Sequence, residues 1–95
     1  MTDYYDETAD WSLIPGHMRG AVQRYVMHGM QPGSFLTAVL TNDLSEAFSR
    51  ADDDNAAAMQ GWVRFLYNYV PSNCKGSAEL VNAWIERGGL NKRAS

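Results

Sequence analysis

The side chains that could perform chemistry in this chain are few, and they do not form a catalytic or metal-binding pattern. His17 and His28 stand 11 residues apart, which on a helix separates them by roughly 16 Å along the axis, too far to share a metal ion. Cys74 is the single cysteine, and no base at a recognisable spacing marks it as a nucleophile. We therefore expect no catalytic residue, no metal site, no cofactor and no enzymatic activity.

The run Asp52–Asp54 is the densest cluster of charge in the sequence. It does not fit a calcium loop, because the EF-hand pattern requires Gly at its sixth position and Glu at its twelfth, where this chain has Ala57 and Val63. Negative charge ahead of a run of alanines favours the start of a helix, whose positive end it stabilises. The same carboxylates also suit a contact surface for a basic partner, and the two interpretations are compatible.

The elements that must position these residues are predicted to be helices. Apolar residues recur at helical spacing in several segments, and no stretch alternates as a strand would. The sequence therefore predicts an all-α fold, a compact bundle of about five short helices in one domain. The predicted helix starts are Gly16, Ser34, the turn Thr41–Asp43, the run Asp52–Asp54 and Ser77.

Ser34 and Ser77 are expected to cap their helices through the side-chain oxygen. The turn before Leu44 predicts a bend, with one longer helix through Asn42 as the alternative. The fourth helix, which ends before Pro71, should be the central one, and its aromatic residues lie on more than one side, so either the bundle covers it all round or one aromatic edge is free. The residues assigned to apolar helix faces include Leu44, Phe48, Val63 and Leu80.

Composition indicates a folded protein rather than a disordered one, because 45% of the 95 residues are hydrophobic and only 20% are charged. The net charge is −3, and the basic residues are scattered, so we expect no direct binding to nucleic acid. A helix-turn-helix interpretation of residues 34–50 meets the same objection, because Asp43 and Glu46 would repel phosphates. No apolar run approaches the roughly 18 residues of a membrane span, so we expect a cytosolic protein.

The chain divides into three parts by charge and pattern. Residues 1–15 form an acidic N-terminal tail whose last residues, Trp11, Leu13 and Ile14, are expected to dock on the domain. Residues 16–89 form the helical domain, and residues 90–95 form a basic C-terminal tail.

The order of residues between Ile14 and Ile85 resembles a group of small uncharacterised proteins encoded by bacteriophages and prophages. The resemblance implies an accessory phage protein in the cytoplasm of a bacterial host, and it carries no catalytic residue. The segments that carry it include Ile14-Pro15-Gly16-His17-Met18-Arg19, Pro32-Gly33-Ser34-Phe35-Leu36, Asn42-Asp43-Leu44, Arg50-Ala51-Asp52, Leu66-Tyr67-Asn68 and Trp84-Ile85.

Small phage proteins commonly act by occupying the surface of a host protein. The leading hypothesis is therefore a non-enzymatic binder, a counter-defence inhibitor of the anti-CRISPR type, whose acidic patch competes with phosphates for the basic groove of a nucleic-acid-binding host protein. The predicted contact residues are Asp43, Glu46, Asp52, Asp53 and Asp54. The alternative is a structural or regulatory phage protein that forms a homodimer through exposed aromatics, with Trp11, Phe65 and Tyr69 as candidates.

Overall fold

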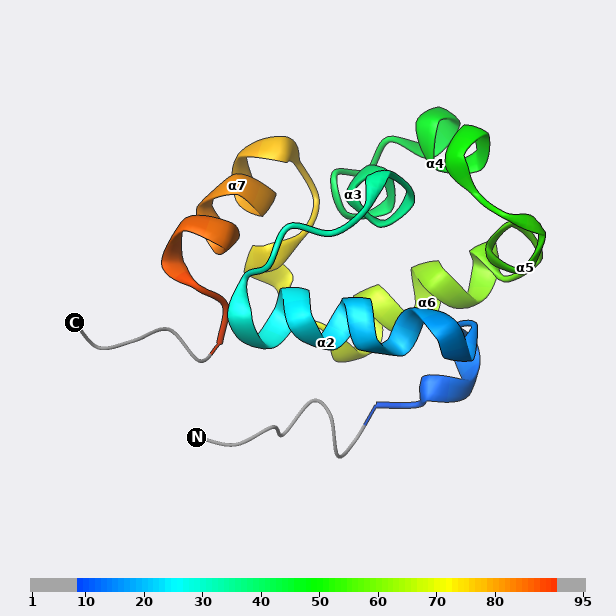
Figure 1. Ribbon diagram of the computed structural model, residues 1–95, viewed down its shortest axis with the longest axis horizontal. Coiled ribbons are helices and arrows are strands. Elements are labelled where there is room, and N and C mark those ends of the chain that lie inside the picture. The colour runs from blue at the N-terminus through cyan, green and yellow to red at the C-terminus, as the bar shows by residue number, and fades with distance from the viewer. Residues whose placement is uncertain (1–8, 91–95) are drawn as a thin grey trace.

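The computed structural model describes residues 9–90 of the chain. The acidic residues 1–8 and the basic residues 91–95 lie outside this range, so the predicted tails are described only where they meet the domain. Within 9–90 all the regular elements are helices and no strand forms, which confirms the predicted all-α fold (Figure 1). In chain order the elements are η1 (Trp11–Leu13), η2 (Gly16–Met18), α2 (Arg19–His28), α3 (Ser34–Leu40), α4 (Leu44–Arg50), α5 (Asp53–Ala57), α6 (Met59–Tyr69), η3 (Ser72–Cys74) and α7 (Ala78–Arg87).

Three helices begin with a side chain that accepts a hydrogen bond from a free backbone amide of the first turn. Asp43 accepts from Glu46 N at 3.2 Å, Asp52 from Asn55 N at 2.8 Å, and Ser77 from Leu80 N at 3.2 Å. These bonds confirm the starts predicted for α4, α5 and α7.

The chain bends between α3 and α4, so the alternative of one longer helix is wrong. Asn42 has a φ of 66°, a left-handed conformation that cannot continue an α-helix. The cap predicted at Ser34 is also wrong. Ser34 is already the first residue of α3, and Gly33 occupies the N-cap position, where no side chain accepts a bond.

The predicted fourth helix is two helices. Ala58, with φ −99° and ψ 13°, separates α5 from α6. Its amide donates to the carbonyls of both Asp54 and Asn55, each 3.1 Å away. The bond to Asn55 spans three residues, as in a 3₁₀ turn, so it tightens the end of α5 and changes the direction of the chain. An alanine-rich segment contains no residue that signals such a break, so the sequence alone predicted a continuous helix.

Trp62 on α6 is the centre of the core, as its place on the central helix predicts. Its side chain is fully buried, its Nε1 donates to Asn55 Oδ1 at 3.1 Å, and its ring meets Phe35 of α3 edge to face at 5.6 Å between centroids. The rest of the buried apolar core comes from every α-helix except α5 and from the segments around Ile14, Val70 and Cys74.

Tyr25 of α2 joins elements that are far apart in the sequence. Its hydroxyl donates to the carbonyl of Cys74 at 2.7 Å, and its own carbonyl accepts from Trp84 Nε1 at 3.0 Å. Burial raises the pKa of Tyr25 well above its usual value, so the phenol stays protonated and remains a donor. These two buried bonds hold α2, η3 and α7 together.

The ends of α2 and α7 meet through two glycines. Gly29 and Gly89 both have a positive φ, 68° and 75°, and a Cβ placed on Gly89 would lie 2.6 Å from Gly29 N. The amide of Leu90 then donates to Val26 O at 2.9 Å. Only residues without a side chain permit this approach.

The N-terminal segment docks on α6 as predicted. Ile14 is buried, and Trp11 and Leu13 pack against the core. The centroid of the Trp11 ring lies 4.8 Å from that of the Phe65 ring. The guanidinium carbon of Arg19 lies 4.5 Å from the Trp11 centroid. Gly61 on α6 makes room for the segment, because a Cβ there would overlap the Leu13 carbonyl oxygen.

This docking corrects the predicted self-association surface. Phe65 is fully buried, and Trp11 and Tyr69 are only partly exposed. The Phe65 ring also packs on Tyr69 at 5.6 Å between centroids. The three aromatics therefore form a stack that attaches η1 to α6, in which Phe65 is buried and Trp11 and Tyr69 keep only part of their surface exposed.

Four residues assigned to apolar helix faces are exposed instead: Leu44 by 60%, Phe48 by 50%, Val63 by 44% and Leu80 by 39%. Leu80 lies in the first turn of α7. The other three lie on α4 and α6, the two helices that border the pocket described next.

Candidate functional site

A pocket of about 320 Å³ lies between α4 and α6. One side is formed by the α3–α4 corner and the other by α6 with the segment through η3. We call it the α4–α6 pocket. Its interior is apolar, and the buried residues that line it are Leu40, Ala47, Met59, Leu66 and Val70.

The mouth of the pocket is apolar as well. Leu44, Val63 and Tyr67 line it and are exposed, Tyr67 by 73%. Val63 and Tyr67 are four residues apart on α6, so they share one helix face, and Leu44 and Phe48 do the same on α4. α4 packs mainly on α3, which leaves these faces of α4 and α6 without a cover.

Two charged side chains of opposite sign line the pocket, one from each side. Asp43 lies at the α3–α4 corner, where its carboxylate is fixed as the cap of α4. Lys75 lies just after η3. Its ammonium is 3.3 Å from the carbonyl oxygen of Val70 and 5.4 Å from the centre of the Tyr67 ring. Partial burial lowers the pKa of Lys75, while the carbonyl contacts hold the ammonium in place.

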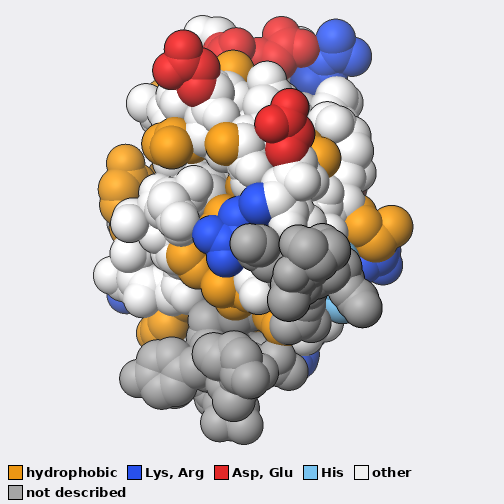
Figure 2. All heavy atoms as spheres, turned by 90° about the vertical axis from the view of Figure 1, so that its left-hand side faces the viewer, with side chains coloured by type: hydrophobic (Ala, Val, Ile, Leu, Met, Phe, Trp, Pro, Cys, Tyr) orange, Lys and Arg blue, Asp and Glu red, His pale blue; other side chains and the backbone are white. Residues whose placement is uncertain are grey.

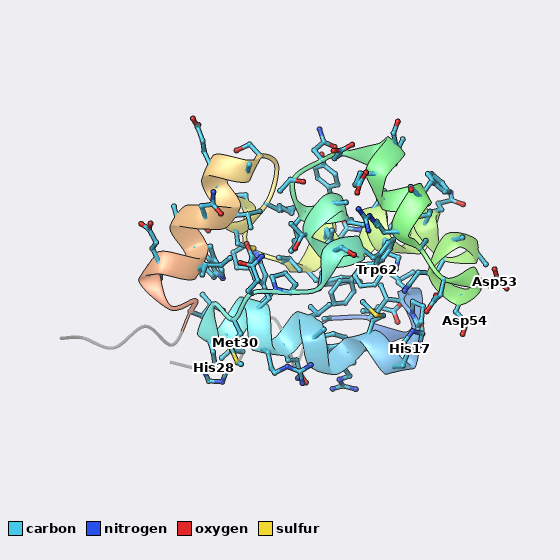
Figure 3. All side chains as sticks on the ribbon, turned by 45° about the horizontal axis from the view of Figure 1, so that its top comes forward. His17, His28, Met30, Asp53, Asp54 and Trp62 are labelled. Carbon is cyan, nitrogen blue, oxygen red and sulfur yellow. The ribbon has the colours of Figure 1, made fainter. Side chains whose placement is uncertain are left out.

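The five carboxylates predicted to bind a partner are distributed over α4 and α5, and we call them the acidic edge: Asp43, Glu46, Asp52, Asp53 and Asp54. Three of them are already engaged. Asp43 and Asp52 cap helices, and Glu46 forms an ion pair with Arg50 at 2.6 Å. Asp53 and Asp54 lie in the first turn of α5, where both are exposed and project outward (Figure 3).

Asp52 also connects α5 to the N-terminal segment. His17 Nε2 lies 3.2 Å from Asp52 Oδ2, and both side chains are about half exposed. The hydrogen bond from the Asn55 amide lowers the pKa of Asp52, with a further contribution from His17. Asp52 is therefore ionised at neutral pH, as a helix cap and a contact residue both require.

The described part of the chain also contains two histidines and one cysteine. His17 lies in η2, just before α2, and His28 is the last residue of α2, so the two are far apart (Figure 3). Cys74 is fully buried, and burial raises the pKa of its thiol to about 12, so it is not a thiolate nucleophile at neutral pH. Among residues 9–90, no three His, Cys, Asp or Glu side chains are grouped closely enough to hold a metal ion.

Basic side chains are dispersed on the face at the α7 end of the molecule, and acidic side chains gather toward its upper edge (Figure 2). The exposed residues at α4 include its cap Asp43, the apolar Leu44 and Phe48, and Arg50, which is paired with Glu46. In the part of the chain that the structure describes, no helix has the length and apolar character needed to cross a membrane.

Comparisons with protein-family models, with curated proteins and with solved structures found no match for this chain.

The α4–α6 pocket was not predicted from the sequence, although Asp43, one of its lining residues, was predicted as a contact residue. The helical spacing predicted that Leu44 and Val63 lie on apolar faces, and such faces were expected to be buried against other helices. The signal that pointed to the pocket was the breadth of the apolar surface on the fourth predicted helix, which left a free aromatic edge as one alternative. The structure shows that such an edge exists and that Tyr67 is its aromatic residue.

Proposed function

We propose that this protein is a non-enzymatic binding protein whose acidic edge contacts a basic surface on a partner protein. The observation that carries the proposal is the start of α5, where Asp53 and Asp54 are both exposed beside the ionised cap Asp52. The first turn of α5 places the two carboxylates next to each other on the surface.

The charge of the acidic edge suits a partner that normally binds phosphates. Carboxylates held at a helix start can pair with the Lys and Arg side chains that line a nucleic-acid-binding groove, and charge complementarity also speeds the encounter. Arg50 is the one basic residue within residues 43–54, and it is paired with Glu46. The edge therefore keeps a net negative charge.

The resemblance to small phage-encoded proteins supports a bacterial host protein as the partner. We propose a nucleic-acid-binding defence component as its class, which makes the protein a counter-defence inhibitor of the anti-CRISPR type.

The test compares two double variants that remove the same charge from opposite parts of the molecule. D53N/D54N neutralises the exposed part of the acidic edge and leaves the cap Asp52 intact. E79Q/E86Q neutralises two exposed carboxylates of α7, which lies far from α5 (Figure 1). Each tagged protein is used to capture partners from a lysate of a bacterial host at low and at high salt.

We expect the unaltered protein and E79Q/E86Q to retain a nucleic-acid-handling protein at low salt and to lose it at high salt. D53N/D54N should retain about tenfold less at low salt. Equal capture by the two double variants, with equal salt dependence, would show that the acidic edge does not bind the partner.

A further inference from the structure

Exposed apolar side chains converge on the α4–α6 pocket. Residues 9–90 expose six large hydrophobic side chains, and three of them, Leu44, Val63 and Tyr67, line this pocket. Phe48 adds a fourth on the same face of α4 as Leu44. Exposed apolar side chains scattered singly need no explanation, but a group around an apolar pocket marks a surface that another molecule covers.

The charges of the pocket limit what that molecule can be. Its lining contains one carboxylate, Asp43, and one ammonium, Lys75, which come from opposite sides. A partner surface of a single charge sign would leave one of them facing a like charge. A small apolar ligand would leave the exposed Leu44 and Tyr67 at the mouth, and Phe48 outside the pocket, in water. A large apolar surface that carries both charge signs would cover the exposed apolar residues and pair both charges.

This chain itself meets those requirements. A two-fold rotation about an axis through the pocket brings each side of the pocket against the opposite side in the second copy, as in any interface that uses the same patch twice. We propose that the α4–α6 pocket is a homodimer interface, in which Tyr67 of each copy packs into the pocket of the other and Asp43 of each copy pairs with Lys75 of the other.

A stable dimer buries about 800 Å² per partner. The proposed contact therefore reaches beyond the pocket lining and includes Phe48, which shares a face of α4 with Leu44. Asp43 belongs both to the acidic edge and to the pocket lining, but Asp53 and Asp54, which carry the proposed function, do not line the pocket, so the two proposals can be tested separately.

The first test is the mass of the full chain in solution, measured by sedimentation from micromolar to millimolar concentrations. We expect the mass to rise from the 10.6 kDa of one chain toward twice that value. Y67E should raise the dimer dissociation constant by about tenfold or more, because it places a charge in the apolar centre of the interface. M30E is the matched control and should dimerise normally, since Met30 is also exposed, by 52%, but follows the end of α2 near His28 (Figure 3) and does not line the pocket.

The second test reverses one charge at a time, at low salt. D43K and K75E should each dimerise weakly, because each places two like charges across the interface. Mixed in equal amounts, they should form a dimer as readily as the unaltered protein, since both charge pairs are then restored. Recovery on mixing also shows that both variants are folded, although D43K loses a helix cap.

A mass of one chain at every concentration would overturn the proposal, and so would normal dimerisation of Y67E. Folded D43K and K75E that remain monomeric when mixed would overturn it too. D53N/D54N should dimerise normally, whereas Y67E should still capture the partner of the acidic edge. The two measurements therefore separate a failure of this inference from a failure of the proposed function.

Discussion

Asn55 is the polar side chain on which the α5–α6 corner depends. It is 3% exposed, its carbonyl oxygen accepts from the indole of Trp62 at 3.1 Å, and its backbone amide donates to the cap Asp52. The residue thus connects an exposed carboxylate to the centre of the core. A change at Asn55 should affect stability and should leave the charge of the acidic edge unaltered.

We predict that N55A lowers the free energy of unfolding by about 1 to 3 kcal/mol, because the buried Trp62 N–H then has no acceptor. N68A is the matched control, since Asn68 is an exposed residue of α6 and its loss should change stability by no more than about 0.5 kcal/mol. Urea unfolding followed by circular dichroism measures both. Equal unfolding midpoints would show that the Asn55–Trp62 bond does not stabilise the fold.

At the scale of single residues, the sequence predicted the helix caps but not the side-chain contacts between distant residues. The helix starts at Asp43, Asp52 and Ser77 could be predicted because a short polar side chain at a helix start satisfies an amide only three residues away. The bond between Asn55 and Trp62 could not, because nothing local indicates that the helix breaks at Ala58 and that Asn55 turns inward. The pairing of His17 with Asp52 joins residues 35 positions apart and was equally hidden.

At the scale of elements, the docking of η1 depends on the absence of a side chain at Gly61. Removing that space should displace η1 without unfolding α6, because alanine is a better helix former than glycine. We predict that G61A exposes Trp11 and speeds proteolytic removal of the N-terminal segment. The α-helical circular dichroism signal should persist.

G16A is the matched control for G61A. A Cβ on Gly16 would have no atom within 4 Å, although Gly16 lies in the same N-terminal segment. Limited proteolysis with mass spectrometry compares the two variants. If G61A and G16A are cleaved at the same rate, the close contact between Gly61 and Leu13 does not hold the segment in place.

The helices themselves could be predicted because their apolar residues repeat every three or four positions. The pattern could not predict how much of each apolar face is buried by neighbouring helices. Val63 and Leu66 belong to the same apolar face of α6, yet Leu66 is buried and Val63 is 44% exposed. The difference arises because α4 packs on α3 and leaves a pocket between itself and α6. The turn at Asn42 and the break at Ala58 set the directions of these helices.

At the scale of the whole molecule, the buried contacts join the two ends of the domain to its centre. The N-terminal η1 rests on α6, and α7 is bonded to α2. Each of these parts contains a tryptophan, with Trp11 in η1, Trp62 in α6 and Trp84 in α7, so the combined tryptophan fluorescence responds to the unfolding of any of them.

We therefore predict one cooperative thermal transition, with coincident curves from tryptophan fluorescence and far-ultraviolet circular dichroism. For 95 residues the enthalpy of unfolding should be about 65 kcal/mol near 60 °C. Two separated transitions, or a calorimetric enthalpy well above the van't Hoff value, would show that η1 or α7 unfolds independently.

The α4–α6 pocket belongs to this scale as well. Its lining residues come from residues 39–47 and 59–76, and neither segment has an unusual sequence by itself. A single sequence indicates which residues are apolar, whereas the pocket depends on the spacing of two helices that contact each other little.

The bond between Trp84 and the carbonyl of Tyr25 has a consequence for synthesis on the ribosome. The two residues are 59 positions apart. At a translation rate of about 5 to 20 residues per second, Trp84 is added about 3 to 12 s after Tyr25. During that interval the apolar face of α2 has no final partner, and the nascent chain is open to chaperones and proteases. The domain closes only when its last helix has emerged.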